Sequence, residues 1–122
     1  MKAQKKKILA VDDNPNNTTI IKELFGERYD LRTAATGKKA LKTALDFQPD
    51  IILLDIMLPD MDGYEVCRLL REHSSLSETK IIMVTAKGAL EDKVTGYEVG
   101  ANDYIAKPFE EKNILESVAF FL

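Results

Sequence analysis

Four short apolar runs in this chain each lead into a polar residue that can contact a metal ion or a phosphate. The runs have the length and unbroken hydrophobicity of parallel strands that are buried on both faces. In an open α/β sheet, ligands bind at the carboxyl ends of the strands, so these polar residues would meet at one edge of one sheet. They are Asp12 and Asp13 after the first run, Asp55 after the second, Thr85 after the third and Lys107 after the fourth. The sequence therefore predicts a site for a divalent cation and a phosphate.

Extended and helical patterns alternate five times along the chain. The predicted strands are 7–11, 29–34, 51–55, 80–85 and 103–106. Between them and after the last, apolar residues recur three or four positions apart, as they do on one face of a helix. These helical patterns include 20–25, 40–45, 66–70, 90–97 and 114–122. Five strand–helix units predict an α/β fold with a parallel sheet, helices on both faces and right-handed crossovers.

Local signals define some of these elements further. Asn14 is a plausible N-cap for the first helix, with Pro15 at the first helical position. Gly96 interrupts the fourth helical pattern, because glycine is a poor helix former. Asp30 and Arg32 alternate with less polar residues in the second strand, which therefore reads as an edge strand with one wet side.

Composition narrows the class of protein. The 122 residues fit one domain, 1–122, and the 45% hydrophobic and 30% charged composition is that of an ordinary globular protein. The net charge of −3 argues against direct nucleic-acid binding by this chain alone. No apolar stretch is long enough for a membrane span or a signal peptide. The single cysteine, Cys67, cannot form an internal disulfide, so the cytoplasm is the expected compartment.

Three other features have ordinary structural interpretations. Cys67 lies among core-facing residues and is expected to pack rather than react. The only histidine, His73, falls at the end of a helical pattern, where a surface role is common, so a phosphodonor should be another protein. The apolar end at 120–122 is expected either to dock on the core or to continue into a longer protein.

The three acidic residues would be costly to bring together without a cation. Two carboxylates about 4 Å apart repel by roughly 1 kcal/mol in water and by about 4 kcal/mol at an effective dielectric constant of 20. A bound divalent cation removes this cost, and a site with only oxygen ligands selects a hard ion such as Mg²⁺, for which Mn²⁺ can substitute. The alternative is that Asp12 or Asp13 simply caps the first helix, since aspartate is a favoured N-cap residue.

Asp55 is the candidate nucleophile of this site. It follows four large apolar residues, and a buried acid without partners would have to become neutral. A carboxylate can attack phosphorus to form an acyl phosphate. Lys107 would offer a positive charge to the phosphate oxygens and Thr85 a hydroxyl donor. Pro108 supports this role for Lys107, because a cis bond before proline in a tight turn would orient the lysine.

The chain resembles the response-regulator receiver domains of two-component signalling, and the resemblance covers essentially its whole length. It implies a flavodoxin-like, three-layer (βα)₅ fold with strand order 2-1-3-4-5. The motifs are weak singly but highly specific in this order and spacing. They are Val11-Asp12-Asp13-Asn14, the stretch 53–63 (LLDIMLPDMDG), Val84-Thr85-Ala86 and the stretch 100–109 (GANDYIAKPF).

The resemblance also implies roles for individual residues. Asp55 matches the phosphoacceptor. Asp13 and Asp55 match the side-chain ligands of Mg²⁺, with Asp12 acting largely through water and Met57 through its backbone carbonyl. The remaining matches are Thr85 to the switch hydroxyl, Tyr104 to the switch aromatic that rotates inward, and Lys107 to the lysine that pairs with phosphate and precedes a cis bond to Pro108.

The function implied by the resemblance is a phosphorylation-dependent switch rather than an enzyme, although it would catalyse its own phosphorylation and dephosphorylation. A histidine kinase or a phosphotransfer protein would donate the phosphoryl group. The surface formed by the fourth helix, fifth strand and fifth helix would then control an effector or a covalently linked output domain. A homodimer through the fourth and fifth helices is a further expectation, and the cognate kinase, signal and output stay open.

Two alternatives have specific sequence tests. A Mg²⁺-dependent phosphatase of the haloacid-dehalogenase type needs a second acid two residues after its nucleophile, where this chain has Met57. A pseudo-receiver would keep the fold and signal by contact alone, without phosphotransfer. Such domains usually lose an acid or the lysine, whereas Asp12, Asp13, Asp55 and Lys107 are all present here.

Overall fold

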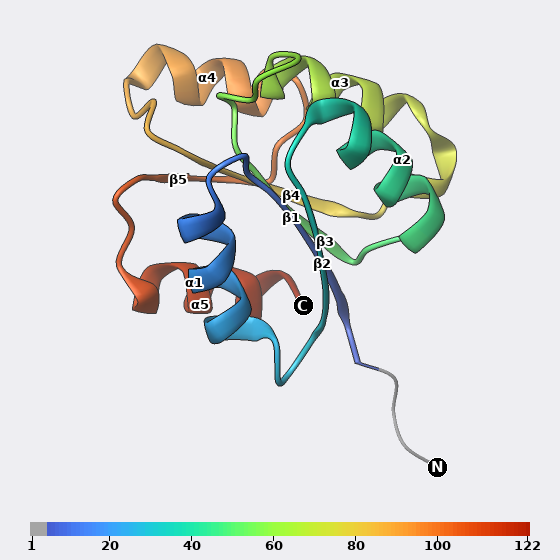
Figure 1. The fold of residues 1–122 in the computed structure, drawn as a ribbon. Coiled ribbons are helices and arrows are strands. Elements are labelled where there is room, and N and C mark those ends of the chain that lie inside the picture. The colour runs from blue at the N-terminus through green and yellow to red at the C-terminus, as the bar shows by residue number, and fades with distance from the viewer. Residues whose placement is uncertain (1–4) are drawn as a thin grey trace.

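The computed structural model describes residues 5–122, which form a parallel sheet between two layers of helices (Figure 1). The strand order is β2-β1-β3-β4-β5 and every pairing is parallel. This confirms the predicted α/β class and the flavodoxin-like topology. The strands are β1 (Lys7–Val11), β2 (Asp30–Ala34), β3 (Ile51–Leu54), β4 (Lys80–Thr85) and β5 (Asp103–Ala106).

The helices divide between the two faces of the sheet. Figure 1 shows α1 and α5 below the sheet and α2, α3 and α4 above it. Their bounds are α1 (Pro15–Phe25), α2 (Gly37–Phe47), α3 (Gly63–Glu72), α4 (Leu90–Glu98) and α5 (Glu111–Phe121), with a short 3₁₀ turn at Ser74–Leu76. None of the helices in the described part of the chain is long and apolar enough to cross a membrane.

Alternation along the central strands creates one apolar core on each face. In β1, Ile8 and Ala10 belong to the core between the sheet and the helices α1 and α5. Leu9 and Val11 belong to the core between the sheet and the helices α2 and α3. Successive side chains of a strand point to opposite faces, and both faces here are covered by helices. Each fully buried large side chain contributes roughly 1.5–3 kcal/mol. These two cores hold the carboxyl ends of β1, β3 and β4 in fixed relative positions.

The start of α1 follows the predicted local signals, and α2 begins in a similar way. Asn14 caps α1, where its side-chain oxygen accepts a hydrogen bond from the Asn16 amide at 2.9 Å, and Pro15 is the first helical residue. Thr36 caps α2 in the same manner by accepting from the Lys39 amide at 3.1 Å. Such caps satisfy amide groups that have no partner inside the helix.

Two predicted strand boundaries are wrong by one residue. Tyr29 lies outside β2, because its amide donates to the Phe25 carbonyl in the turn that follows α1. Asp55 lies outside β3: its amide still donates to the Val11 carbonyl, but its side chain accepts from the Met57 amide and so begins the next turn. The edge position predicted for β2 is confirmed, and Arg32 is exposed there.

Three further structural expectations are met, whereas Gly96 does not interrupt α4, which continues through it to Glu98. Cys67 is fully buried in the core, and His73 is exposed at the end of α3. Phe121 and Leu122 pack against the core between the sheet and the helices α1 and α5, which is the first of the two alternatives expected for the apolar end, while Phe120 is exposed.

Candidate functional site

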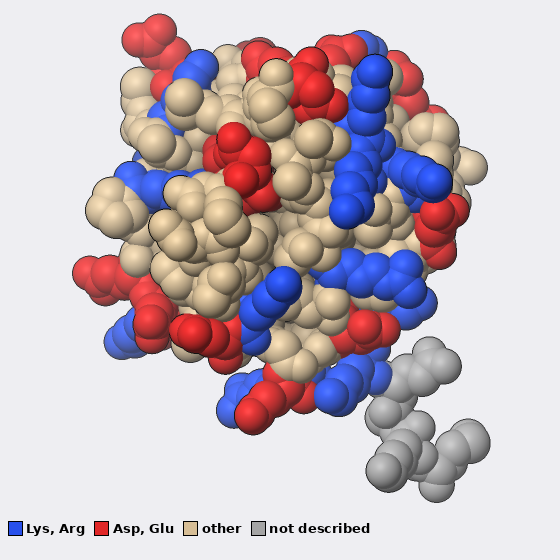
Figure 2. All heavy atoms as spheres, in the orientation of Figure 1, with Lys and Arg blue, Asp and Glu red and all other residues tan. Residues whose placement is uncertain are grey.

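The strand order brings the predicted polar residues to one edge of the sheet. Asp12 follows β1 and Asp55 follows the neighbouring β3, while Thr85 ends β4 and Lys107 follows β5. Figure 2, drawn in the orientation of Figure 1, shows acidic side chains near the middle of the view, where β1 ends. The structure thus confirms that strand-end residues from four segments converge.

Three carboxylates form the centre of the site. Asp12, Asp13 and Asp55 each place an oxygen within 4.8 Å of the others. Asp55 is buried, with 6% of its surface exposed, and Asp13 faces solvent. A surface hollow lined by Asp13 and Met57 opens beside them. Carboxylate oxygens with an open, wet side suit Mg²⁺, which usually binds one or two carboxylates and keeps several waters.

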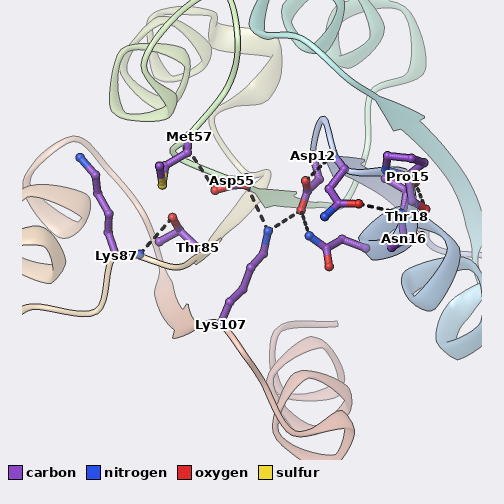
Figure 3. Close-up of polar contacts among 11 residues, drawn as sticks. Asp12, Pro15, Asn16, Thr18, Asp55, Met57, Thr85, Lys87 and Lys107 are labelled. Atoms are coloured by element: carbon purple, nitrogen blue, oxygen red, sulfur yellow. Dashed lines mark hydrogen bonds and ion pairs between the residues drawn. The ribbon is translucent and has the colours of Figure 1, made fainter.

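Lys107 supplies the positive charge of the cluster. Its ammonium lies 2.5 Å from Asp12 Oδ2 and 3.1 Å from Asp55 Oδ2, and it points between these two residues in Figure 3. Burial alone would lower the pKa of Lys107, but the hydrogen bonds and charges of Asp12 and Asp55 outweigh burial and raise that pKa. The bond between Lys107 and Pro108 is cis. Lys107 is therefore a charged lysine directed at the acid cluster.

Asp12 is held by residues at the start of α1, the helix that follows it. Its carboxylate accepts hydrogen bonds from the Asn14 amide at 2.9 Å and from the Asn17 side chain at 3.1 Å. The N-cap of α1 is Asn14, so the alternative that Asp12 or Asp13 caps this helix is wrong. Asn17 was not predicted from sequence, although its place in the first turn of the helix after Asp12 and Asp13 could have indicated it.

The loop between β3 and α3 passes close behind Asp55. Met57 donates its amide to Asp55 Oδ1 at 3.1 Å and forms an isolated bridge with Asp62. Gly63 then packs so tightly that a Cβ atom would lie 2.4 Å from the Asp55 carbonyl oxygen. Only glycine allows this close approach. The packing of Gly63 therefore holds the backbone around Asp55 in place.

Asp60, which sequence reasoning missed, ties the same loop to α2. Its carboxylate accepts hydrogen bonds from the amides of Gly37 at 2.7 Å and Lys38 at 3.0 Å. These backbone hydrogen bonds lower the pKa of Asp60. The contact joins this loop to the start of α2 across 23 residues, so no local pattern pointed to it.

Thr85 and Tyr104 lie beside the cluster on the α4 side. Thr85 is fully buried, and its hydroxyl oxygen accepts from the Lys87 amide at 3.4 Å (Figure 3). Tyr104 is also buried, with 8% of its surface exposed, and its hydroxyl donates to the Lys87 carbonyl. Burial raises the pKa of Tyr104. The aromatic ring predicted to rotate inward therefore occupies an inward position in this structure.

Comparisons with known proteins agree on one family. The response regulator receiver domain family matches residues 8–119. The alkaline phosphatase synthesis transcriptional regulatory protein PhoP of Bacillus subtilis is 46% identical over 89% of this chain and 45% of its own length. The DNA-binding dual master transcriptional regulator RpaA of Synechocystis is 38% identical over 95% of this chain and 48% of its own.

The solved structures agree with these relatives. The chemotaxis protein CheY4 of Vibrio cholerae superposes with a TM-score of 0.91 at 32% identity, covering 97% of this chain and 99% of that chain. The chain spans about half the length of the two curated regulators named above. From the family match, the fold and the converging strand-end residues, we conclude that this chain belongs to the response regulator receiver domain family.

Proposed function

We propose that this domain is a signalling switch that accepts a phosphoryl group on Asp55 from a histidine kinase or a phosphotransfer protein. The observation that carries the proposal is the position of Lys107, whose ammonium contacts both Asp12 and Asp55 beside an open acid cluster. A phosphoryl group on Asp55 would lie within reach of the positively charged Lys107 ammonium. With a free cysteine in its core, the domain suits a reducing compartment, and we place its function in the cytoplasm.

The chemistry is a transfer between two nucleophiles. An oxygen of the Asp55 carboxylate attacks the phosphorus of a phosphohistidine, the phosphorus–nitrogen bond breaks, and the imidazole leaves with a proton from solvent. Lys107 then pairs with the phosphoryl oxygens. Mg²⁺ held by Asp13, Asp55 and the Met57 carbonyl, with Asp12 through water, would neutralise charge on the transferred group.

The change at Asp55 would be read by the residues on the α4 side. The Thr85 hydroxyl would donate a hydrogen bond to the phosphoryl group, and the inward position of Tyr104 would be favoured. Driving a two-state equilibrium from 1:99 to 99:1 takes about 5.5 kcal/mol of differential stabilisation. A few hydrogen bonds to a charged group, at roughly 1.5–3 kcal/mol each, are sufficient for this.

The surface near Lys107 offers a place for the phosphodonor protein. A groove of about 390 Å³ lies there, lined by Asn17, Ile20, Lys107, Pro108 and Phe109 among others. Its polar residues Asn17 and Lys107 contact Asp12 of the acid cluster, so a protein docked on its apolar residues could present a phosphohistidine to Asp55.

The output would be carried by α4, β5 and α5. Leu90, Val94 and Tyr97 lie on one side of α4 and are all exposed, which suits a second copy or an output domain as partner. The curated relatives named above are transcriptional regulators about twice as long as the matched region. We propose that the chain acts in the same way, by controlling an output domain or separate effector and by dimerising through α4 and α5.

The decisive experiment is the intact mass of the protein after incubation with a small acyl-phosphate donor, with and without Mg²⁺. Wild type should gain one phosphoryl group only when Mg²⁺ is present. Asp55→Asn should gain none and should keep the circular dichroism spectrum of wild type. Asp46→Asn, a change at an exposed acid of α2, is the matched control and should be phosphorylated normally. Phosphate uptake by Asp55→Asn at the wild-type rate would refute the assignment.

A further inference from the structure

The helix α4 has few local interactions of its own to hold it in place. Its N-cap residue, Ala89, makes no side-chain capping bond. Leu90 is 76% exposed and Gly96 is the only buried residue of the helix. Its position over the sheet must therefore depend on contacts with other elements.

A hydroxyl group from α3 makes one such contact. Tyr64 is partly buried beside the core above the sheet, and its hydroxyl donates to the Asp92 carbonyl at 2.8 Å. The contact joins the first turn of α3 to the first turn of α4, 28 residues further along the chain. Tyr64 thus anchors the uncapped end of α4.

The same hydroxyl lies next to Tyr104. The side chains of Tyr64 and Tyr104 are neighbours, and each donates its hydroxyl to a backbone carbonyl, one in α4 and the other at Lys87 in the loop before it. A phenol is protonated at neutral pH, and burial raises the pKa of both tyrosines further, so both are hydrogen-bond donors. Two tyrosines therefore hold the segment that leads from Thr85 into α4.

Close packing couples the position of α4 to the ring of Tyr104. A Cβ atom on Gly96 would lie 3.1 Å from Cδ2 and 3.3 Å from Cε2 of this ring. The backbone of α4 therefore rests almost directly on Tyr104. A shift of α4 and a movement of Tyr104 cannot be independent of one another.

We propose that Tyr64 is a positioning residue of the switch, whose hydroxyl bond to the Asp92 carbonyl holds α4 over the buried ring of Tyr104. This inference rests on the proposed function, because it assigns Tyr64 to the regulation of the same site. The bond favours the inward state of Tyr104 before any phosphoryl group arrives. It sets the starting balance that phosphorylation of Asp55 then shifts.

The variant Tyr64→Phe removes only the hydroxyl and keeps the ring. Tyr29→Phe is the matched control, because Tyr29 packs on Phe25 at the opposite end of the sheet. Amide hydrogen exchange in 90–98 should become about fivefold faster in Tyr64→Phe, as expected for the loss of one hydrogen bond, and should be unchanged in Tyr29→Phe. Equal exchange rates in Tyr64→Phe and wild type would overturn the proposal.

The position of Tyr104 gives a second readout that a purely structural role would not move. The chain has four tyrosines, so fluorotyrosine-labelled protein should give a resolvable ¹⁹F signal for Tyr104, assigned with Tyr104→Phe. Tyr64→Phe should increase the solvent-exposed share of this signal. A lower unfolding temperature with no change in the Tyr104 signal would instead show a structural role and refute the proposal.

The failure of this inference is distinguishable from failure of the proposed function. Exchange in α4 and the Tyr104 signal are measured without phosphate, and Tyr64→Phe should still take up a phosphoryl group on Asp55. If wild type takes up none, the proposed function fails. If both proteins are phosphorylated but α4 and Tyr104 behave alike in them, only the role of Tyr64 fails.

Discussion

Lys107 reaches across a whole strand to contact Asp55: the two residues follow β5 and β3, and β4 lies between them in the sheet. The Nζ atom nevertheless lies 3.1 Å from Asp55 Oδ2, so the lysine side chain spans the end of β4. The Lys107 ammonium therefore lies where the oxygens of a phosphoryl group on Asp55 could contact it. Positive charge is thus already present at the acid cluster in the unmodified domain.

This contact predicts how the stability conferred by Lys107 depends on pH. Asp12 and Asp55 raise the pKa of Lys107 above its ordinary value of 10.5, against the opposing effect of burial. Because the folded protein holds this proton more tightly than the unfolded chain, the contribution is fully present below about pH 10.5 and is lost as the pH rises through the folded-state pKa. Lys107→Met should therefore cost about 1–3 kcal/mol at neutral pH and progressively less in alkali.

The measurement is urea unfolding of both proteins between neutral pH and about pH 11.5, a window set by the raised lysine pKa. Lys112→Met is the control, because Lys112 also pairs with a carboxylate but is exposed: its Nζ atom lies 3.8 Å from Glu116 Oε1. Its effect should be close to zero at every pH. A cost of Lys107→Met that stayed constant across this range would show that the lysine acts through packing and not through its charge.

The close approach of Gly63 to Asp55 makes a second prediction. A Cβ at this position would lie 2.4 Å from both the Asp55 carbonyl oxygen and Ile56 Cα, and both are backbone atoms with no freedom to move away. Gly63→Ala should therefore destabilise the domain by about 1–3 kcal/mol or more and should slow phosphoryl uptake by displacing Asp55. Gly88→Ala is the matched change, because its Cβ would meet only Ala106 Cβ at 3.4 Å. Equal stability of the two variants would contradict the argument.

Some site residues could be predicted from sequence because a local pattern identifies them, whereas others depend on contacts between residues far apart in the chain. The apolar runs of β1, β3, β4 and β5 and the polar residues after them are local patterns, so Asp12, Asp55 and Lys107 could be placed at one edge by topology alone. The N-cap Asn14 and the following Pro15 are local signals too.

The contacts that were missed depend on how separate elements meet. Asp60 contacts Gly37 across 23 residues and Tyr64 contacts Asp92 across 28, and each contact needs the final packing of α3 against its neighbours. The end of β3 was misplaced for a similar reason. Its last predicted residue, Asp55, still bonds through its amide to β1 although its side chain already belongs to the turn.

Asp60 carries a prediction of its own. Removing its carboxylate in Asp60→Ala leaves the amides of Gly37 and Lys38 without that acceptor, so the unfolding temperature should fall at neutral pH. Because the backbone hydrogen bonds depress the pKa of Asp60 below 3.8, its contribution is present above about that pH and is lost as the pH falls through the folded-state value. The difference between wild type and variant should therefore shrink in acid, as thermal unfolding by circular dichroism would show.

The control for this experiment is Asp46→Ala, which removes an exposed acid further along α2. It should leave the unfolding temperature nearly unchanged at neutral pH. Asp60→Asn adds a discriminating case, since an amide keeps one acceptor oxygen and should retain part of the stabilisation. A variant Asp60→Ala as stable as wild type at pH 7 would show that water replaces the carboxylate at no cost.

The acid cluster predicts a specific response to Mg²⁺. Lys107 offsets one of the three negative charges of Asp12, Asp13 and Asp55, so repulsion between the carboxylates persists without a cation. Asp13→Asn should therefore unfold at a higher temperature than wild type when no divalent ion is present, because it removes one charge from the exposed side of the cluster.

Adding Mg²⁺ should reverse this order. A ligand at 100 times its Kd stabilises the native state by about 2.7 kcal/mol, and wild type should approach this gain while Asp13→Asn shows much less. Thermal unfolding across a Mg²⁺ titration, with sodium chloride added to hold ionic strength constant, measures both effects. Asp46→Asn should respond as wild type does, since it lies outside the cluster. An equal response to Mg²⁺ in Asp13→Asn and wild type would exclude Asp13 as a ligand, because the loss of a coordinating carboxylate must weaken binding.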